Sequence, residues 1–316
     1  MTLVRRRFAD RSPTFIGGMC TIGASVAFTI NDMSVKSLSG GYPLHEVILI
    51  RSLVALAIVL GVIMPLTGGF GQVRTKQIRR HLIRGCFVVF SNIVFFSALA
   101  SMPLADATAI FFVAPLIIAA FSVIFLGEVV GPWRWGAIGV GLVGAIFVIQ
   151  PGSDSFTAIA LLPLLAATAY AGLQTMTRLM GPGEKATTMA FYIQVTFLTF
   201  SLLFGLIFGS GWMDTSDNPS ISFLMRRWIW PDPSDMVFFL GAGLGTAFGG
   251  WLISQAYRLC QAAIIAPLEY VAMPMAILWG IVIFGDFPNS LTWIGIFLIL
   301  GAGIFLIIRE TRLSRR

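Results

Sequence analysis

Charged residues are scarce in this chain: they make up 11% of its 316 residues, whereas hydrophobic residues make up 57%. A soluble globular domain carries roughly 25% charged residues. This shortage, together with a mean hydropathy of +0.89, excludes water as the main solvent of the folded chain. The composition therefore predicts an integral membrane protein whose main surroundings are the lipid bilayer.

Cysteine and the common catalytic motifs are also missing or nearly so. Cys20, Cys86 and Cys260 each lie in an apolar run without a CxxC pair, which argues against disulfides and a zinc site. There is no Walker A motif, so ATP could drive the protein only through another subunit. HExxH, GxSxG and histidines inside the apolar runs are lacking as well, which argues against an intramembrane enzyme. The sequence thus predicts no catalytic residue, no metal and no cofactor.

Apolar runs bounded by charges, prolines and glycines follow one another along the whole chain. None shows the sustained alternation of a transmembrane β-strand. Since a spanning helix needs about 20 apolar residues, we expect an all-α membrane protein of about ten spans. The predicted spans are 15–37, 45–66, 82–100, 104–126, 132–149, 156–178, 187–209, 235–258, 263–284 and 289–308.

Basic residues lie at the ends of these runs and are divided unevenly between the two sides. Seventeen of the 21, Arg84 among them, fall on one side, three fall on the other, and Arg51 lies inside a run. Because cytoplasmic loops are rich in Lys and Arg, this predicts both termini in the cytoplasm of a bacterial inner membrane. The net charge of +7 then reflects topology, so no nucleic acid partner is expected. The long loop 210–234 is predicted to be an ordered excursion on the outer side.

The chain repeats itself internally. At a shift of 158 residues, Gly127-Glu128 meets Gly285-Asp286 and Trp135 meets Trp293; at a shift of 142, Lys36 meets Arg178. This divides the chain into a tail at 1–14, five-span repeats at 15–149 and 156–308, and a basic tail at 309–316. Because five is odd, the second repeat enters the membrane in the opposite orientation. Such an inverted repeat provides the two nearly equivalent arrangements that alternating access requires.

Small residues and prolines predict how the spans pack. Two stripes with a spacing of four residues, Ala137/Gly141/Ala145 and Gly241/Gly245/Gly249, favour close helix contacts. Pro115 and Pro274 predict kinks in the fourth and ninth spans.

The sequence predicts ten spans in two halves, a Gly-acid pair at the end of spans four and nine, and a tryptophan after each pair. This pattern resembles the EamA-type branch of the drug/metabolite transporter superfamily. The resemblance covers about 15–308. It implies a substrate cavity between the halves, lined by spans one, three, four, six, eight and nine, with span two at the periphery. The segment 266–270 (APLEY) is also similar to a motif of bacterial members, some of them linked to S-adenosylmethionine uptake.

Ionisable side chains inside the bilayer are candidates for function, because each costs at least about 2.5–3.5 kcal/mol on insertion scales. Glu269 lies in span nine, and its repeat counterpart is the apolar Phe111. A carboxylate among aromatic rings suits an ammonium or sulfonium group; alternatively, Glu269 caps a helix or pairs with an arginine. The other residues predicted to bind the substrate are polar or aromatic, namely Tyr270, Trp279, Tyr257, Gln255, Trp251, Asn92, Gln174 and Tyr192.

A second group of charges favours gating. Asp32 and Lys36 share a helix face near the outer surface, and Gln174 and Arg178 are their repeat counterparts near the inner surface. The alternative is a local ion pair with basic side chains that snorkel to the membrane surface. Arg51 either holds a substrate carboxylate or neutralises Asp32 or Glu46, and its place in span two favours the latter.

These observations favour a secondary transporter of a small organic metabolite, such as an amino acid, another zwitterion or an organic cation related to S-adenosylmethionine. Proton coupling through Glu269, exchange and facilitated flux all stay open. So do a monomer and a homodimer. The alternatives are an intramembrane enzyme and a channel on the same scaffold, although a channel would not explain the inverted repeat.

Overall fold

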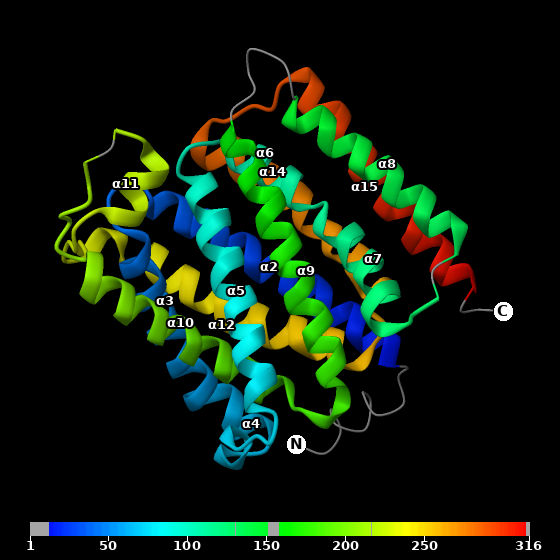
Figure 1. Ribbon diagram of the computed structural model, residues 1–316, viewed down its shortest axis with the longest axis horizontal. Helices are drawn as coiled ribbons and strands as arrows, with labels where there is room; N and C mark the ends of the chain where they lie inside the picture. Colours follow the sequence, from blue (N-terminus) through cyan, green and yellow to red (C-terminus); the bar gives the residue numbers. More distant parts are fainter. Residues whose placement is uncertain (1–12, 130, 151–157, 216, 314–316) are drawn as a thin grey trace.

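The computed structural model describes residues 13–129, 131–150, 158–215 and 217–313, and the regular structure within these ranges is helical (Figure 1). The predicted all-α fold is confirmed for this part of the chain. Most of the predicted tail 1–14 lies outside the described residues. The predicted tail 309–316 begins inside a helix, because the last helix continues to Leu313.

The helices follow the predicted spans closely. The first half contains α2 (Pro13–Leu38), α3 (Leu44–Ile58) continued by η1 (Val59–Ile63) and α4 (Met64–Thr67), η2 (Phe70–Val73), α5 (Ile78–Leu99), α6 (Leu104–Phe111), α7 (Ala114–Leu126) and α8 (Pro132–Ile149). The second half contains η3 (Ala158–Leu161), α9 (Leu162–Met180), η4 (Gly181–Gly183), α10 (Ala186–Phe208), α11 (Pro219–Met225), η5 (Pro233–Asp235), α12 (Met236–Leu259), α13 (Ala262–Ile265), η6 (Ala266–Val271), α14 (Ala272–Phe284) and α15 (Ser290–Leu313).

Within the described residues, seven helical segments are long and apolar enough to cross a membrane. They are Leu44–Thr67, Ile78–Leu99, Leu104–Leu126, Ala158–Gly183, Ala186–Phe208, Pro233–Leu259 and Ala266–Phe284. Helix α2 is not among them, and the apolar stretches of α8 and α15 cover only Trp135–Ile149 and Ser290–Phe305. The protein is therefore a multi-pass helical membrane protein, and the count of ten spans stays a prediction.

The two halves contribute neighbouring helices to one bundle. Helix α2 packs along α12, α5 along α9, and α3 along α10, while α8 and α15 form a pair at one side (Figure 1). The Gly241/Gly245/Gly249 stripe faces α2, as the spacing predicted. A Cβ atom at Gly245 would lie 2.4 Å from the Ala27 carbonyl oxygen, so α2 and α12 touch backbone to backbone there.

Helices four and nine of the predicted order are both interrupted. The first breaks between α6 and α7, and the second tightens into the 3-10 segment η6 between α13 and α14. Both interruptions end before the predicted kink prolines, because Pro115 lies in the first turn of α7 and Pro274 in the first turn of α14. A proline is tolerated there since the first amide groups of a helix have no intrahelical partner. Each of the two spans is thus interrupted just before its predicted kink proline.

The described part of the long loop, 210–215 and 217–234, contains α11 and η5 and packs on the turn between α2 and α3. Arg226 Nη1 donates to the carbonyl oxygen of Ser39 at 3.2 Å, and the Tyr42 hydroxyl donates to Asp235 Oδ2 at 2.7 Å. The side-chain hydroxyl and backbone N–H of Ser234 both donate to Asp232 and hold the pKa of its carboxyl below the usual value. This loop therefore closes one end of the bundle.

Candidate functional site

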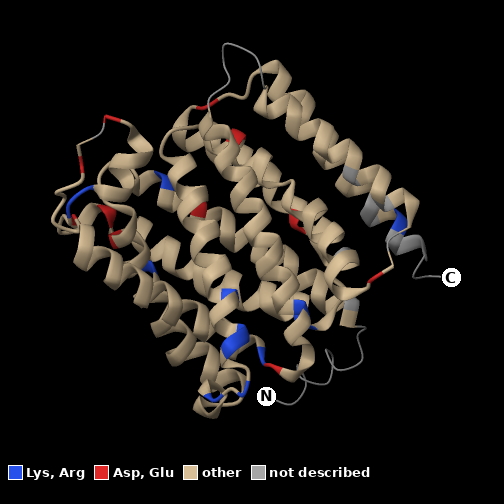
Figure 2. Ribbon diagram, viewed as in Figure 1, with Lys and Arg blue, Asp and Glu red and all other residues tan. Residues whose placement is uncertain are grey.

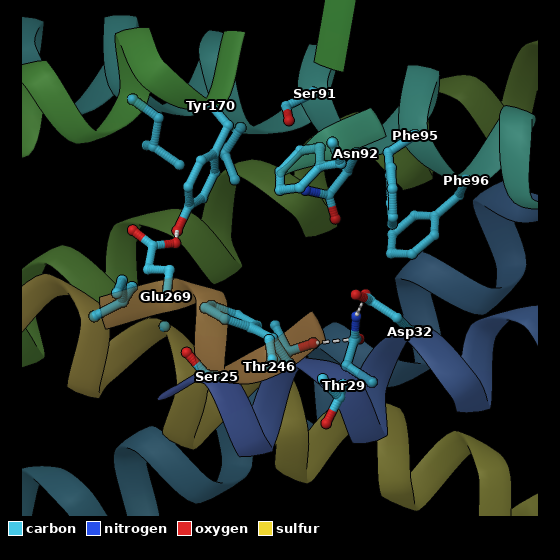
Figure 3. Close-up of a pocket in the computed structure, with 18 of the residues that line it drawn as sticks. Ser25, Thr29, Asp32, Ser91, Asn92, Phe95, Phe96, Tyr170, Thr246 and Glu269 are labelled. Carbon is cyan, nitrogen blue, oxygen red and sulfur yellow. Dashed lines mark hydrogen bonds between the residues drawn. The ribbon is translucent and has the colours of Figure 1, made fainter. Parts of the chain in front are cut away.

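A cavity lies at the centre of the bundle, between the two halves. Its wall is formed by α2, α3, α5 and α6 of the first half and by α9, α10, α12, η6 and α14 of the second. Polar and charged side chains enter it from several of these elements, while phenylalanine rings cover much of the rest (Figure 3). Charged residues are otherwise sparse along the helices, as Figure 2 shows. The cavity thus collects most of the charge that the sequence places inside the membrane.

Glu269 is an acidic group at this cavity, as predicted, and its partners are two tyrosines. The Tyr170 hydroxyl of α9 donates to Glu269 Oε2 at 2.8 Å (Figure 3). The Tyr257 hydroxyl of α12 donates to Glu269 Oε1. Its side chain is buried, and η6 places it where the helix is tightened to a 3-10 turn. No arginine or helix end among the described residues is its partner, so the carboxylate is held by phenol groups from two other helices.

Arg51 also faces the cavity, which corrects the expectation that span two is peripheral. Its Nη1 donates to Asn31 Oδ1 at 2.8 Å and its Nη2 to Asn92 Oδ1 at 2.7 Å. The guanidinium lies between the rings of Phe96 and Phe197, 5.1 and 5.0 Å from their centroids. These amide and ring contacts stabilise a buried cation without a direct carboxylate contact.

The acids proposed to neutralise Arg51 have other partners. Asp32 lines the cavity and accepts from Asn31 Nδ2 at 2.9 Å, so Asn31 lies between the two charges. Glu46 accepts from the backbone N–H of Ile229 at 3.1 Å. The terminal nitrogens of the Arg51 guanidinium donate to Asn31 and Asn92, and no ion pair joins Arg51 to either acid among the described residues.

Arg84 is a cavity residue that the sequence analysis missed. It was counted among the cytoplasmic basic residues, yet it is buried in the second turn of α5. It donates to Thr177 Oγ1 at 2.7 Å, to the Met189 carbonyl oxygen at 3.0 Å and to Ser254 Oγ at 2.8 Å. All three acceptors are neutral. A signal was available in the sequence, because Arg84 lies inside the apolar run that begins at residue 82.

Aromatic rings form much of the remaining wall. The set comprises Phe28, Phe95, Phe96, Phe111, Phe112, Tyr170 and Phe197. Phe111 lies 4.9 Å from Phe95 and 5.4 Å from Tyr170, centroid to centroid. The wall also contains two buried polar side chains that make no hydrogen bond within the described part of the chain, Gln174 and Thr108. A ligand with both a planar ring and hydrogen-bonding groups fits such a lining.

The structure brings some of the predicted site residues together and separates others. Glu269, Asn92, Gln174, Asp32 and Arg51 line the cavity. Tyr257 lies behind the wall and reaches it through Glu269. The predicted residues Tyr270, Trp279, Gln255, Trp251 and Tyr192 do not line it.

The residues outside the cavity have identifiable neighbours. Tyr270 packs near Phe112, 5.8 Å between ring centroids, and Trp279 packs against the main hydrophobic core. Trp251 packs against a cluster formed by the end of α3 and by α10. On α12 the cavity positions are Thr246, Gly250 and Ile253, one helix face, and Trp251 and Gln255 lie on other faces.

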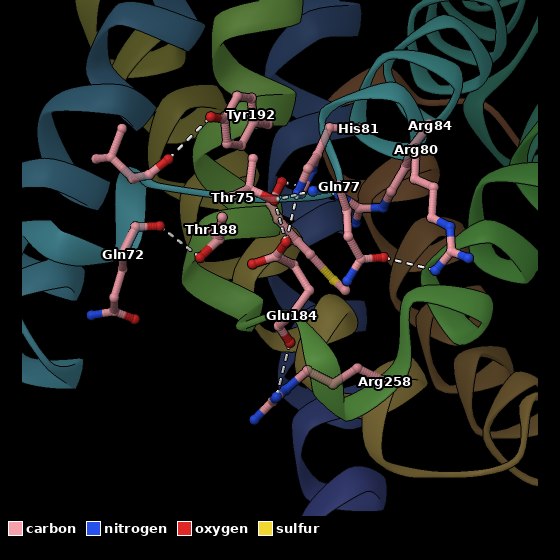
Figure 4. Close-up of polar contacts among 12 residues, drawn as sticks. Gln72, Thr75, Gln77, Arg80, His81, Arg84, Glu184, Thr188, Tyr192 and Arg258 are labelled. Carbon is pink, nitrogen blue, oxygen red and sulfur yellow. Dashed lines mark hydrogen bonds and ion pairs between the residues drawn. The ribbon is translucent and has the colours of Figure 1, made fainter.

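Tyr192 belongs to a separate polar cluster at one end of the bundle (Figure 4), and Gln255 adjoins this cluster through Arg258. The Tyr192 hydroxyl donates to the Val73 carbonyl oxygen at 3.0 Å, and its ring stacks on His81 at 4.4 Å. His81 Nε2 lies 3.3 Å from Glu184 Oε2. Arg258 links this cluster to α12, because it donates to the Glu184 carbonyl oxygen at 3.0 Å and to Gln255 Oε1 at 2.8 Å. These contacts join α5, the turn after α9, and α12.

The two predicted gating cations have partners in the opposite half of the chain. Lys36 Nζ lies 3.8 Å from Asp286 Oδ2, and Arg178 Nε lies 3.4 Å from Glu128 Oε1. Lys36 therefore makes its ion pair across the halves, not with Asp32 on its own helix. These two pairs lie outside the cavity lining.

The chain is similar to known transporters over most of its length. Residues 15–150 match the model of the EamA-like transporter family. The chain is 28% identical to a riboflavin transporter of Vibrio cholerae serotype O1, over 94% of each chain. It is 30% identical to a riboflavin transporter of Rhizobium johnstonii, over 78% of this chain and 76% of the relative. It is 24% identical to an S-adenosylmethionine uptake transporter of Rickettsia prowazekii, over 96% of each chain.

Proposed function

Because this chain belongs to the EamA-like transporter family of the drug/metabolite transporter superfamily, we propose that it is a secondary transporter that moves a small organic solute by alternating access. The observation that carries the proposal is the cavity between the two halves, which nine helical elements form and which aromatic, amide and charged side chains line. A central site of this kind is where transporters with internal repeats bind their substrates.

We place this transporter in a bacterial inner membrane with ten spans, both termini in the cytoplasm, and five-helix repeats at 15–149 and 156–308. Ten helical segments at the predicted ranges support the count. The paired interruptions before α7 and α14 support the repeat. Once Arg84 is assigned to the cavity, 17 minus 1 leaves 16 basic residues on the predicted cytoplasmic side, which still far exceeds the three on the other side.

The cavity lining favours a solute with a planar aromatic ring, and riboflavin is the first candidate. Seven aromatic side chains line the wall. The unpartnered amide of Gln174 and hydroxyl of Thr108 offer both donors and acceptors to the polar edge of such a ring. Arg84, whose partners are all neutral, adds a cation that suits carbonyl oxygens or a partial negative charge. Two of the relatives are named riboflavin transporters, which agrees with this cavity chemistry.

The second candidate is the zwitterion or organic cation that the sequence favours. Glu269 is the specific observation behind it, because its carboxylate lies among the aromatic rings Tyr170 and Tyr257. A relative named for S-adenosylmethionine uptake supports the same candidate. The buried acids Glu269 and Asp32 and the cations Arg51 and Arg84 give the cavity both signs of charge.

Counterflow into proteoliposomes tests the function and the substrate together. We expect purified protein, preloaded with unlabelled riboflavin, to accumulate labelled riboflavin with saturation. Phe111→Ala should weaken riboflavin binding about tenfold, since an aromatic pair contributes about 0.5–1.5 kcal/mol. Phe125→Ala is the matched control, because Phe125 is 60% exposed on α7 and does not line the cavity.

Other outcomes would redirect the proposal. Counterflow of S-adenosylmethionine or an amino acid without riboflavin would favour the second candidate. Flux that rises linearly with concentration, without counterflow, would indicate a channel and would contradict alternating access.

A further inference from the structure

We propose that the ion pairs Lys36–Asp286 and Arg178–Glu128 are two latches that close the cavity from opposite faces of the membrane, one latch at each face. The inference rests on the alternating access of the proposed function and adds two acids, Glu128 and Asp286, to the residues that control it. Each latch links the two halves of the chain, since α2 and α7 belong to the first repeat and α9 and α14 to the second.

The two ion pairs join residues at equivalent positions of the internal repeat. Lys36 corresponds to Arg178 at a shift of 142 residues, and Glu128 corresponds to Asp286 at a shift of 158. The cation of the first half thus contacts the acid of the second, and the cation of the second half contacts the acid of the first. An inverted repeat that places two equivalent contacts at opposite faces produces this reciprocal pattern.

The same backbone cap holds both acids in place. Gly127 and Gly285 end α7 and α14 in the left-handed conformation, with φ of 66° and 69°. The next residue donates its N–H back into the helix: Glu128 to Ser122 at 3.0 Å, and Asp286 to Gly280 at 3.0 Å. Each of these bonds spans six residues and closes the end of its helix, and glycine adopts the left-handed conformation at this position without strain. Each acid therefore leaves its helix at a fixed position.

Electrostatics makes a cationic partner favourable at this position. A carboxylate just beyond a helix C-terminus lies against the negative end of the helix dipole. Lys36 and Arg178 lie in the last turns of α2 and α9, where a cation is favoured for the same reason. When the C-terminal end of one helix approaches that of its partner, the acid and the cation neutralise each other. When the two halves separate at that face, both side chains lose this neutralising partner.

The pairs lie toward opposite ends of the bundle. Lys36 Nζ also donates to the carbonyl oxygen of Met102, which follows the C-terminal end of α5, at 2.8 Å. Arg178 adjoins Thr177, whose hydroxyl accepts from Arg84 near the N-terminal end of α5. Since the 22 residues of α5 are about 33 Å long, the pairs are separated by most of the membrane thickness. The cavity lies between them.

Partly buried pairs of this kind suit a latch. The side chains are 13% and 31% exposed in Lys36–Asp286, and 26% and 11% in Arg178–Glu128. Because solvent reaches all four side chains, each pair adds little to stability, and each contact can open without unfolding the bundle. A contact made only while one face is closed shifts the equilibrium between the two arrangements. Loss of one latch should therefore favour the arrangement that is open to that face.

Accessibility of a cavity cysteine tests the latches without knowledge of the substrate. In a background with Cys20, Cys86 and Cys260 changed to Ala, Thr29→Cys places one thiol in the cavity lining. A membrane-impermeant maleimide is applied to right-side-out and to inverted vesicles. We expect Glu128→Gln to raise the labelling rate at least threefold from one face, and Asp286→Asn to raise it as much from the other face.

Matched variants separate a latch from general loosening. The exchange Glu128→Arg with Arg178→Glu restores the pair and should restore slow labelling, whereas Asp214→Asn in the outer loop should leave both rates unchanged. Melting temperatures identify variants that fail to fold. Equal increases from both faces, or no increase from either, overturn the inference. Since labelling needs no solute, a negative result with intact riboflavin counterflow would reject the latches and leave the proposed function standing.

Discussion

At the scale of single residues, Glu269 and Phe111 give the cavity its asymmetry. They occupy corresponding positions of the repeat, and both contact Tyr170: Glu269 by a hydrogen bond of 2.8 Å and Phe111 by a ring contact of 5.4 Å. The scaffold thus presents a carboxylate on one side of Tyr170 and an apolar ring on the other. Two-fold packing alone would not require this difference, which favours a role in transport.

We expect Glu269→Gln to abolish pH-driven accumulation of solute while preserving counterflow, because the amide keeps the shape but cannot carry a proton. Proteoliposomes with and without a pH gradient provide the measurement, and Glu269→Asp is the control that keeps the ionisable group. A loss of affinity for a cationic solute would instead assign Glu269 to charge recognition. Wild-type behaviour in both assays would reduce Glu269 to a structural residue that holds Tyr170 and Tyr257.

Which charged residues line the cavity was only partly predictable. Glu269, Asp32 and Arg51 were identifiable because charges inside apolar runs are costly and rare. Arg84 was not identified, since it follows a cluster of basic residues and its position resembles a topology signal. Its burial depends on Thr177 and Ser254, two hydroxyl residues far away in the sequence, which no local pattern reveals.

At the scale of elements, the glycine stripe of α12 sets the distance to α2. A Cβ at Gly245 would lie 2.4 Å from the Ala27 carbonyl oxygen and 3.0 Å from the backbone nitrogen of Asn31. These are backbone atoms, so only movement of a whole helix could relieve the contact. Asn31 and Asp32 face the cavity from this part of α2, which couples helix packing to the site.

We expect Gly245→Leu to separate α2 from α12, to lower the melting temperature by several degrees and to impair counterflow. Overpacking of this kind costs typically 1–3 kcal/mol. Gly139→Ala is the control: it is also in a helix, but a Cβ there meets nothing within 4 Å, so it should be neutral or slightly stabilising. Unchanged yield, melting temperature and transport in Gly245→Leu would contradict the packing described here.

Element ranges followed from hydropathy, but the interruptions within them did not. The break between α6 and α7 and the 3-10 segment η6 lie inside continuous apolar runs, where composition gives no boundary. Pro115 and Pro274 predicted a disturbance in each of these two spans, and both interruptions end just before the proline. On α12, by contrast, the cavity face at Thr246, Gly250 and Ile253 follows helical spacing, so a helical projection would have excluded Trp251 and Gln255.

At the scale of the whole molecule, the two ends of the bundle differ in character. One end carries the Glu184, His81 and Arg258 cluster beside the basic 74–80 segment (Figure 4). The other end carries the 210–234 loop, fastened to Tyr42 by Asp232 and Asp235. The predicted inverted repeat would make the transmembrane parts nearly equivalent, so we expect these end structures and the basic residues to fix the orientation.

Orientation is therefore the property of the whole molecule that most needs measurement, and single cysteines at its two ends provide it. Lys76 and Asp217 are exposed, and they lie in the basic segment and in the long loop. In a cysteine-free background we expect an impermeant maleimide to label Asp217→Cys in intact cells and Lys76→Cys only after lysis, because basic loops stay in the cytoplasm. Denatured protein, labelled fully at both positions, controls for thiol reactivity. Labelling of Lys76→Cys but not Asp217→Cys in intact cells would reverse the orientation and assign the Arg178–Glu128 pair to the outer face.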